Sequence, residues 1–195
     1  MVDIPFSDPE QKRKAKEGLL LVRGLLDGLG IPWWICAGTL LGAVRERDFI
    51  PHDSDIDLGT WGHVEGHGRI RECLERNGVP CCWDLGKEGE PGHQYAFKLP
   101  GSVPDGPVHL DLFFYEKEAG RCWSPLWAGG KPRKVWYLPI AGLTTIEFLG
   151  ERFPAPGNYM EQIAVNYGPG WRTPIAPMER GGTWNWSCSM PNLER

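Results

Sequence analysis

The chain has 195 residues, of which 41% are hydrophobic and 24% charged, and a formal net charge of −4 at pH 7, a composition typical of a globular protein. The negative charge argues against a nucleic-acid-binding protein, because such proteins normally carry a basic surface. No segment approaches the roughly 20 apolar residues of a membrane span, and the N-terminus lacks the apolar region of a signal peptide, so we expect a single cytoplasmic domain over residues 1–195.

The first predicted element is a helix at about residues 9–29. Asp8 is placed as its N-cap, Pro9 occupies the first helical position, and Gln11 completes a capping box. Apolar residues then recur at helical spacing, at Ala15, Leu19, Val22, Leu26 and Leu29. Gly30, followed closely by a proline, ends the helix.

A short apolar run from Trp33 to Ala37 is typical of a buried strand. Gly38-Thr39 follows, and LLGAVRER after it indicates a short helix. A glycine between a strand and a helix lets the backbone approach a phosphate, and the helix N-terminus supplies N–H donors and partial positive charge. Together with the acidic strand that comes next, this makes Gly38 and Thr39 candidate phosphate-binding residues.

The next stretch, PHDSDIDLGTW, carries an acid at every second position, which allows two interpretations. A calcium-binding EF-hand loop that began at Asp53 would need glycine at its sixth position and glutamate at its twelfth. The sequence has Leu58 and Val64 there, so this interpretation fails. Asp53 and His52 are instead assigned to a loop that precedes a strand.

The strand interpretation places two carboxylates on one face, because alternate side chains of a strand share a face. Asp55 and Asp57 would point outward while Ile56 and Leu58 enter the core. In the later strand VHLDLFF, Asp111 alternates with leucines in the same way. Three such carboxylates on neighbouring strands would repel one another unless a cation lay among them, and oxygen ligands suit Mg²⁺ or Mn²⁺. The alternative is that all three are solvated acids.

The remaining elements complete an α+β domain around one mixed sheet flanked by helices. We predict a helix at 69–77, strands at 79–85, 93–99 and 108–116, a hairpin within 121–139, and a helical pattern over 144–167 that FPAPGN interrupts. The core spans about 31–174, the last helix is NYMEQIAVNYG, and the tail at 175–195 is irregular.

The six cysteines form no Cys-x-x-Cys pair and are expected to be reduced, mostly buried thiols. A zinc site that combines Cys81 and Cys82 with a histidine stays open as an alternative. His63 and His67 have the spacing of helical metal ligands, but their surroundings are rich in glycine. We therefore expect both histidines to lie in a solvated loop.

The segment WICAGTLLGAVRERDFIPHDSDIDLGTW resembles the LicD family, which includes the fukutin-related proteins. It has that family's Gly-Thr-Leu-Leu-Gly-x-x-Arg run, then Phe-Ile-Pro, then an acidic cluster that ends in Asp-Ile-Asp. HLDLFFY, YLP, FPAPGNYMEQIAVNYG and GWRTP extend the similarity to roughly Trp33–Pro174. Ser54 departs from the family, which commonly has another Asp there.

The resemblance implies a polymerase β-like nucleotidyltransferase fold and transfer of a phospho-alcohol, such as phosphocholine or ribitol phosphate, from a CDP-linked donor to a sugar hydroxyl. Asp55 and Asp57 would hold Mg²⁺ or Mn²⁺ at the donor's pyrophosphate, and Asp111 would be a third ligand or the base for the acceptor hydroxyl. Gly38 and Thr39 would contact the phosphates. Further candidates for phosphate binding, each with a surface role as its alternative, are Arg45, Lys98 and Arg172.

Two other functions stay open at this point. One is transfer of NMP from an NTP to a small-molecule hydroxyl, which would use the same residues, and the other is nucleotide binding without chemistry. Trp61, Trp184 and Trp186 could stack on a base or sugar, and nothing in the sequence selects among them.

Overall fold

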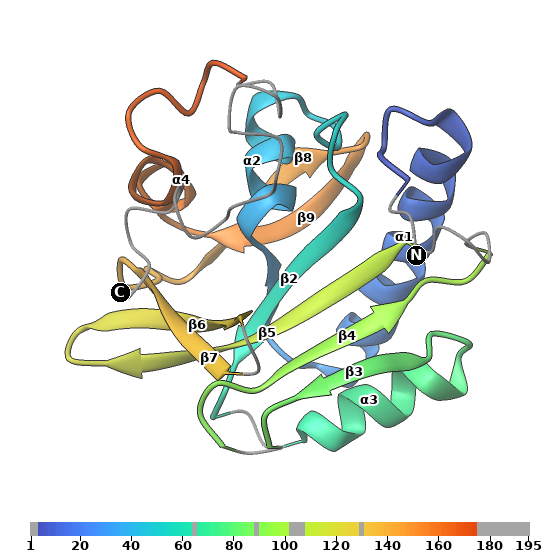
Figure 1. Ribbon diagram of the computed structural model, residues 1–195, viewed down its shortest axis with the longest axis horizontal. Coiled ribbons are helices and arrows are strands. Elements are labelled where there is room, and N and C mark those ends of the chain that lie inside the picture. Colours follow the sequence, from blue (N-terminus) through green and yellow to red (C-terminus); the bar gives the residue numbers. More distant parts are fainter. Residues whose placement is uncertain (1–3, 64–65, 88–89, 102–107, 129–130, 175–195) are drawn as a thin grey trace.

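The computed structural model describes residues 4–63, 66–87, 90–101, 108–128 and 131–174. In this part of the chain, helices flank a mixed sheet, and a separate two-stranded sheet lies beside them (Figure 1). The helices are α1 (Pro9–Leu29), α2 (Ala37–Arg45), α3 (His67–Arg76) and α4 (Tyr159–Tyr167). The strands are β1 (Trp33–Ile35), β2 (Asp55–Trp61), β3 (Cys81–Leu85), β4 (Gln94–Lys98), β5 (His109–Glu118), β6 (Arg121–Ala128), β7 (Lys131–Tyr137), β8 (Leu143–Phe148) and β9 (Glu151–Pro156).

The main sheet has the strand order β1-β2-β5-β4-β3, and the hairpin of β6 and β7 extends from β5. β2 and β5 pair in parallel, and the other strand pairs are antiparallel. The predicted α+β class with a mixed central sheet is therefore confirmed. The parallel pair matters most for function, because its register sets Asp57 beside Asp111.

The two faces of the sheet carry different side chains. On one face, Ile56 and Leu58 of β2 are fully buried in the main hydrophobic core, which also includes Leu19 of α1 and Ile70 of α3. This face is therefore covered by α1 and α3. The other face carries the acidic residues of β2 and β5 and, farther along β5, a second small core. Its buried members are Trp34, Cys36, Tyr115, Cys122, Val135 and Tyr137.

The N-terminal helix begins and ends as predicted. The Asp8 carboxylate accepts a hydrogen bond of 2.8 Å from the Gln11 amide, and Pro9 is the first helical residue. Gly30 follows the helix with φ of 67°, a left-handed conformation that favours glycine. The apolar stripe of α1 is buried in the main core.

The helical pattern predicted from Thr144 onward is wrong in its first half, where β8 and β9 form a hairpin. Thr144, Thr145 and Ile146 are β-branched and favour extended backbone. The turn at Leu149 and Gly150 has positive φ at both residues, 56° and 76°, as a two-residue hairpin turn requires. The last helix is present as α4, and the hairpin predicted within 121–139 is β6–β7.

Gly59, on β2, lies against two aromatic rings. A Cβ atom there would be 2.5 Å from Trp34 Nε1 and 2.9 Å from Tyr115 Cε2. Both rings are buried, so neither can move aside freely. We expect Gly59→Ala to lower the free energy of unfolding by about 1–3 kcal/mol, measured by urea denaturation.

Gly24→Ala is the matched control for this substitution. Gly24 is an exposed residue in the middle of α1, and a Cβ there would meet nothing within 4 Å. Alanine should therefore stabilise the protein by about 0.5–1 kcal/mol. Equal effects of the two substitutions would show that the ring contacts at Gly59 do not limit side-chain size.

No helix among the described residues combines the length and apolar character needed to cross a lipid bilayer.

Candidate metal site

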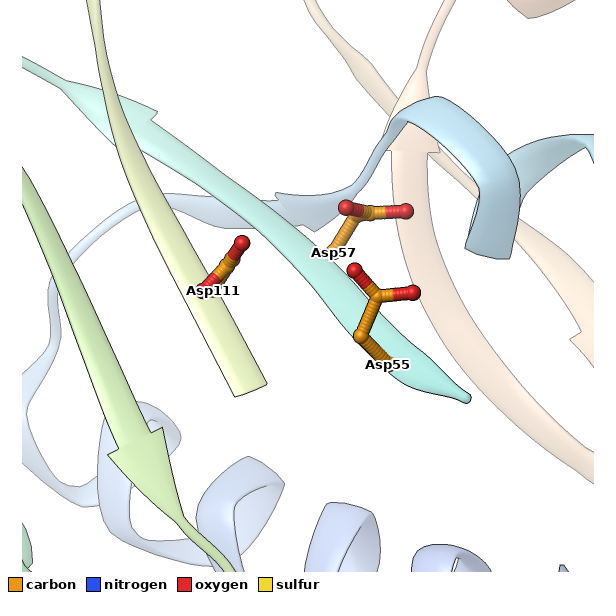
Figure 2. Close-up of side chains that lie close together, drawn as sticks. All are labelled: Asp55, Asp57 and Asp111. Atoms are coloured by element: carbon orange, nitrogen blue, oxygen red, sulfur yellow. The ribbon is translucent and has the colours of Figure 1, made fainter. Parts of the chain in front are cut away.

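Three carboxylates meet at the pairing of β2 with β5. Asp55 and Asp57 project from β2, and Asp111 projects toward them from β5 (Figure 2). One carboxylate oxygen from each residue can be chosen so that all three lie within 4.8 Å of one another. Within the described ranges, no other group of three or more His, Cys, Asp or Glu residues is placed to hold a metal ion. The predicted juxtaposition of the three acids is thus confirmed.

The carboxylates are placed where negative charge is costly. Burial, followed by the charges of Asp55 and Asp111, raises the pKa of Asp57 well above its ordinary range. Burial and the charge of Asp55 also raise the pKa of Asp111, to about 8, against a hydrogen bond from Gln94 that lowers it. No lysine or arginine of the described chain forms an ion pair with any of the three. A site of acidic oxygens without a counter-charge fits a hard divalent cation such as Mg²⁺ or Mn²⁺.

The N-terminus of α2 holds Asp57 in position. The Thr39 amide donates a hydrogen bond of 3.2 Å to Asp57 Oδ2, and the Gly38 amide also donates to this carboxylate. In return, Thr39 Oγ1 accepts a hydrogen bond of 2.8 Å from the Asp57 amide. The partial positive charge of a helix N-terminus thus acts on a carboxylate of the protein.

This arrangement corrects one prediction about local structure. β1 ends at Ile35 and α2 begins at Ala37, so Gly38 and Thr39 lie inside the first turn of the helix and not in a turn before it. Because their amides bind Asp57, both residues orient a candidate metal ligand. Contact between these residues and a phosphate stays a prediction.

Gly38 has a second role, which is steric. A Cβ atom at this position would lie 2.7 Å from Asp53 Oδ2 and 3.2 Å from Asp57 Oδ2. Glycine therefore lets two carboxylates approach the helix closely. The close approach that glycine allows at position 38 is thus to two acids, and a close approach of a phosphate to the same residue stays a prediction.

Asp53 belongs to the acidic cluster as well as to the loop in which it was predicted to lie. Its backbone does form that loop, with hydrogen bonds to Ile50 and Phe6. The residue, however, is only 6% exposed, and its carboxyl group is hydrogen-bonded to the side chain of Asp55. Burial and then the charge of Asp55 raise the pKa of Asp53 well above its usual range. The signal for this role was the spacing of acids by two, which includes Asp53.

Two predicted phosphate-binding residues, Arg45 and Arg172, lie near the last turn of α2. Arg45 is in the last turn of α2, where Nε donates to Glu46 at 2.6 Å and Nη1 donates to the Trp171 carbonyl at 3.3 Å. The guanidinium of Arg172 lies over the Trp171 ring, 4.3 Å from its centroid. Asp57 of β2 contacts the opposite, N-terminal end of α2. Among the described residues, neither arginine forms an ion pair with the three carboxylates, and their contact with a phosphate stays a prediction.

Lys98 is brought to the acidic face. It is the last residue of β4, is half-buried, and pairs with His109 of β5. Trp61, by contrast, packs edge-to-face against Trp34 at 5.0 Å and under the Lys117 ammonium. Its ring is partly buried in the second core. Trp184 and Trp186 lie outside the described residues.

The histidine prediction is wrong for His67. This residue begins α3 and is 3% exposed, with its ring 3.8 Å from Phe114 and its Nδ1 3.3 Å from that of His93. His93 in turn is 2.8 Å from Asp84 through Nε2. His63 is exposed, as expected. The cysteines proposed for zinc, Cys81 and Cys82, join no group of potential metal ligands in the part of the chain that the structure describes.

A family model named LicD and described as "LicD/FKTN/FKRP, nucleotidyltransferase domain" matches residues 30–158. The matched range contains all the acidic residues of the site. The chain is 31% identical over 185 residues to the ribitol-5-phosphate transferase FKTN of Mus musculus, covering 94% of this chain and 37% of that protein. It is 28% identical over 165 residues to the ribitol 5-phosphate transferase FKRP of Mus musculus, covering 81% of this chain and 32% of that protein.

The chain thus spans about a third of the length of these curated relatives. Among solved structures, it is similar to the crystal structure of ANT(2″)-Ia in complex with adenylyl-2″-tobramycin, with a TM-score of 0.44 and 16% sequence identity. That similarity covers 89% of this chain and 88% of the other.

Proposed function

The chain belongs to the LicD family of nucleotidyltransferase domains, and on this premise we propose that it is a metal-dependent transferase. It moves a phospho-alcohol group from a CDP-linked donor to a hydroxyl of a sugar or related acceptor, and it releases CMP. The observation that carries the proposal is the cluster of Asp55, Asp57 and Asp111. Because its relatives are named ribitol-5-phosphate transferases, ribitol phosphate is the first group to test.

Asp55, Asp57 and Asp111 would hold Mg²⁺ or Mn²⁺, since all three offer carboxylate oxygens within one small region. When bound, the cation would supply positive charge to the transferring phosphoryl group and to the departing CMP. The helix α2 would keep Asp57 in the orientation needed for this role, through the Gly38 and Thr39 amides.

Asp111 is the candidate to receive the proton of the acceptor hydroxyl. It lies on β5 at the edge of the cluster, and although most of the residue is buried, part of it stays exposed, so an acceptor can approach it. The Gln94 side chain fixes its carboxylate by a hydrogen bond. A carboxylate in this position would orient the hydroxyl as well as remove its proton.

The test is a donor screen with the purified chain and Mg²⁺. CDP-ribitol, CDP-choline, CDP-glycerol and CTP are incubated separately, with a mixture of mono- and oligosaccharides as acceptors, and the nucleotide products are separated by chromatography. We expect CMP from one of the CDP-alcohols, with no release when EDTA is present. Pyrophosphate release from CTP would instead indicate transfer of NMP. If no donor is turned over, the remaining interpretation is a domain that binds nucleotide but catalyses no reaction.

A further inference from the structure

The acidic face of the sheet continues past Asp111 onto β4 and β3. Asp111 is paired with Ala96 of β4, and Ala96 is paired with Trp83 of β3. Directly paired residues of antiparallel strands point to the same face. Trp83 is therefore in one row with Asp111, two strands farther from the metal cluster. The adjacent row contains His109 and Lys98.

The Trp83 side chain is exposed, although burial of a tryptophan normally lowers the free energy of the folded state. Its exposed fraction is 49%, and it is the one aromatic residue among the exposed large hydrophobic side chains of the described residues. Its ring centroid lies 4.9 Å from that of His109, with the planes inclined by 58°. His109 is the register neighbour of both Asp55 and Lys98. Through its contact with His109, the Trp83 indole thus lies next to the acidic cluster.

The position of Trp83 relative to the carboxylates indicates which substrate it contacts. In phosphoryl transfer, the attacking and leaving oxygens lie roughly in line, on opposite sides of the phosphorus. β1 and the N-terminus of α2 flank the cluster on the β2 side, and β4 and β3 extend it on the β5 side. Asp111, the candidate base, stands between the Asp55–Asp57 pair and Trp83. A donor held near α2 leaves the β5 side for the acceptor.

We propose that Trp83 and His109 form the ring-binding part of the acceptor subsite, and that they take the apolar face of a pyranose sugar. This inference rests on the proposed function. The C–H bonds on one face of a pyranose ring present a flat apolar surface that packs on an indole, while the ring hydroxyls stay at its edge. Lys98 adds a positive charge beside this surface and favours a sugar that carries a nearby hydroxyl or anionic group.

The first experiment measures sugar binding directly. The full chain, with Mg²⁺ and CMP, is applied to an array of immobilised neutral and phosphorylated mono- and oligosaccharides. We expect Trp83→Ala to reduce the apparent affinity for every sugar that the unmodified chain binds by about tenfold or more. Trp83→Phe, which keeps a flat ring, should restore most of it. Leu21→Ala is the matched control, because Leu21 is an exposed apolar residue of α1, on the other side of the sheet.

The second experiment measures CMP binding by calorimetry in the presence of Mg²⁺. Trp83→Ala should leave this affinity unchanged. A tenfold loss of CMP affinity would assign Trp83 to the nucleobase and overturn the inference. The inference would also be overturned if Trp83→Ala left sugar binding on the array unchanged, or if neither protein bound any sugar.

Failure of the proposed function gives a different pattern. If Trp83 is required for sugar binding but no CDP-alcohol yields CMP, the transferase proposal fails and the sugar subsite stands. If CMP is released and Trp83→Ala changes neither sugar binding nor the KM for a sugar acceptor, the subsite fails and the transferase proposal stands.

Discussion

Asp57→Asn is expected to lower kcat/KM for CMP release by at least about 10³-fold while the fold stays intact. Asparagine has the shape of aspartate, and its side-chain oxygen can still accept the Thr39 amide hydrogen bond at the start of α2. The substitution therefore removes the negative charge and little else. The charge is what a divalent cation needs from this residue, so metal binding and turnover should be lost together.

The same substitution should not destabilise the metal-free protein. Burial and the neighbouring charges of Asp55 and Asp111 disfavour the ionised form of Asp57 in the folded state. A neutral residue removes that cost, so the free energy of unfolding of the variant in EDTA should equal or exceed that of the unmodified chain. Loss of activity together with retained or increased stability would show that Asp57 acts in the site and does not stabilise the fold.

Asp27→Asn is the control for this prediction. Asp27 accepts a hydrogen bond of 2.8 Å from Trp33 Nε1, and asparagine can accept it as well. The residue lies near the end of α1, outside the acidic cluster. Full activity is expected for Asp27→Asn. If Asp57→Asn retained more than about a tenth of the activity, the role of the cation proposed here would be wrong.

The metal-free protein should lose stability as the pH rises from about 4 to about 8. The pKa of Asp111 is raised from 3.8 to about 8 in the folded state, so the folded protein holds a proton in this range that the unfolded chain has lost. Stability falls with pH wherever the folded state binds more protons. Each unit of pKa difference corresponds to about 1.4 kcal/mol, and Asp57 contributes in the same direction.

A bound cation should reverse this trend. Mg²⁺ binds the deprotonated carboxylates, so its stabilising effect should be small near pH 5 and larger near pH 8. The measurement is the melting temperature in EDTA and in Mg²⁺ across this range. In Asp111→Asn, the slope of the melting temperature with pH in EDTA should become shallower. A melting temperature in EDTA that rises over the same interval would contradict the proposed charge state of the cluster.

The sequence was most informative where a short-range rule decided the outcome. Alternation along β2 predicted that Asp55 and Asp57 share a face, and the structure agrees. The capping residues of α1 predicted its first turn for the same reason. In both cases the relevant contacts lie within a few residues of one another, and local geometry is enough.

Other features depended on packing between distant segments. His67 lies in a glycine-rich stretch that looks solvated, yet Phe114 and His93 bury its ring. Thr144–Phe148 shows apolar spacing compatible with a helix, but its pairing with β9 makes it a strand. The position of Trp83 beside His109 follows from the order of β5, β4 and β3, which no local pattern encodes.

The parallel pairing of β2 with β5 has a consequence for how the protein folds. Asp57 and Asp111 are more than fifty residues apart in the chain, and α3, β3 and β4 lie between them. We expect the closure of such a long loop to come late in folding, because its entropy cost precedes any gain from the contact. Until β5 has docked, the sheet contains Asp55 and Asp57 of the proposed metal site but not Asp111. If the site binds a cation as proposed, we expect the cation to slow unfolding of the completed sheet and to have little effect on the rate of folding.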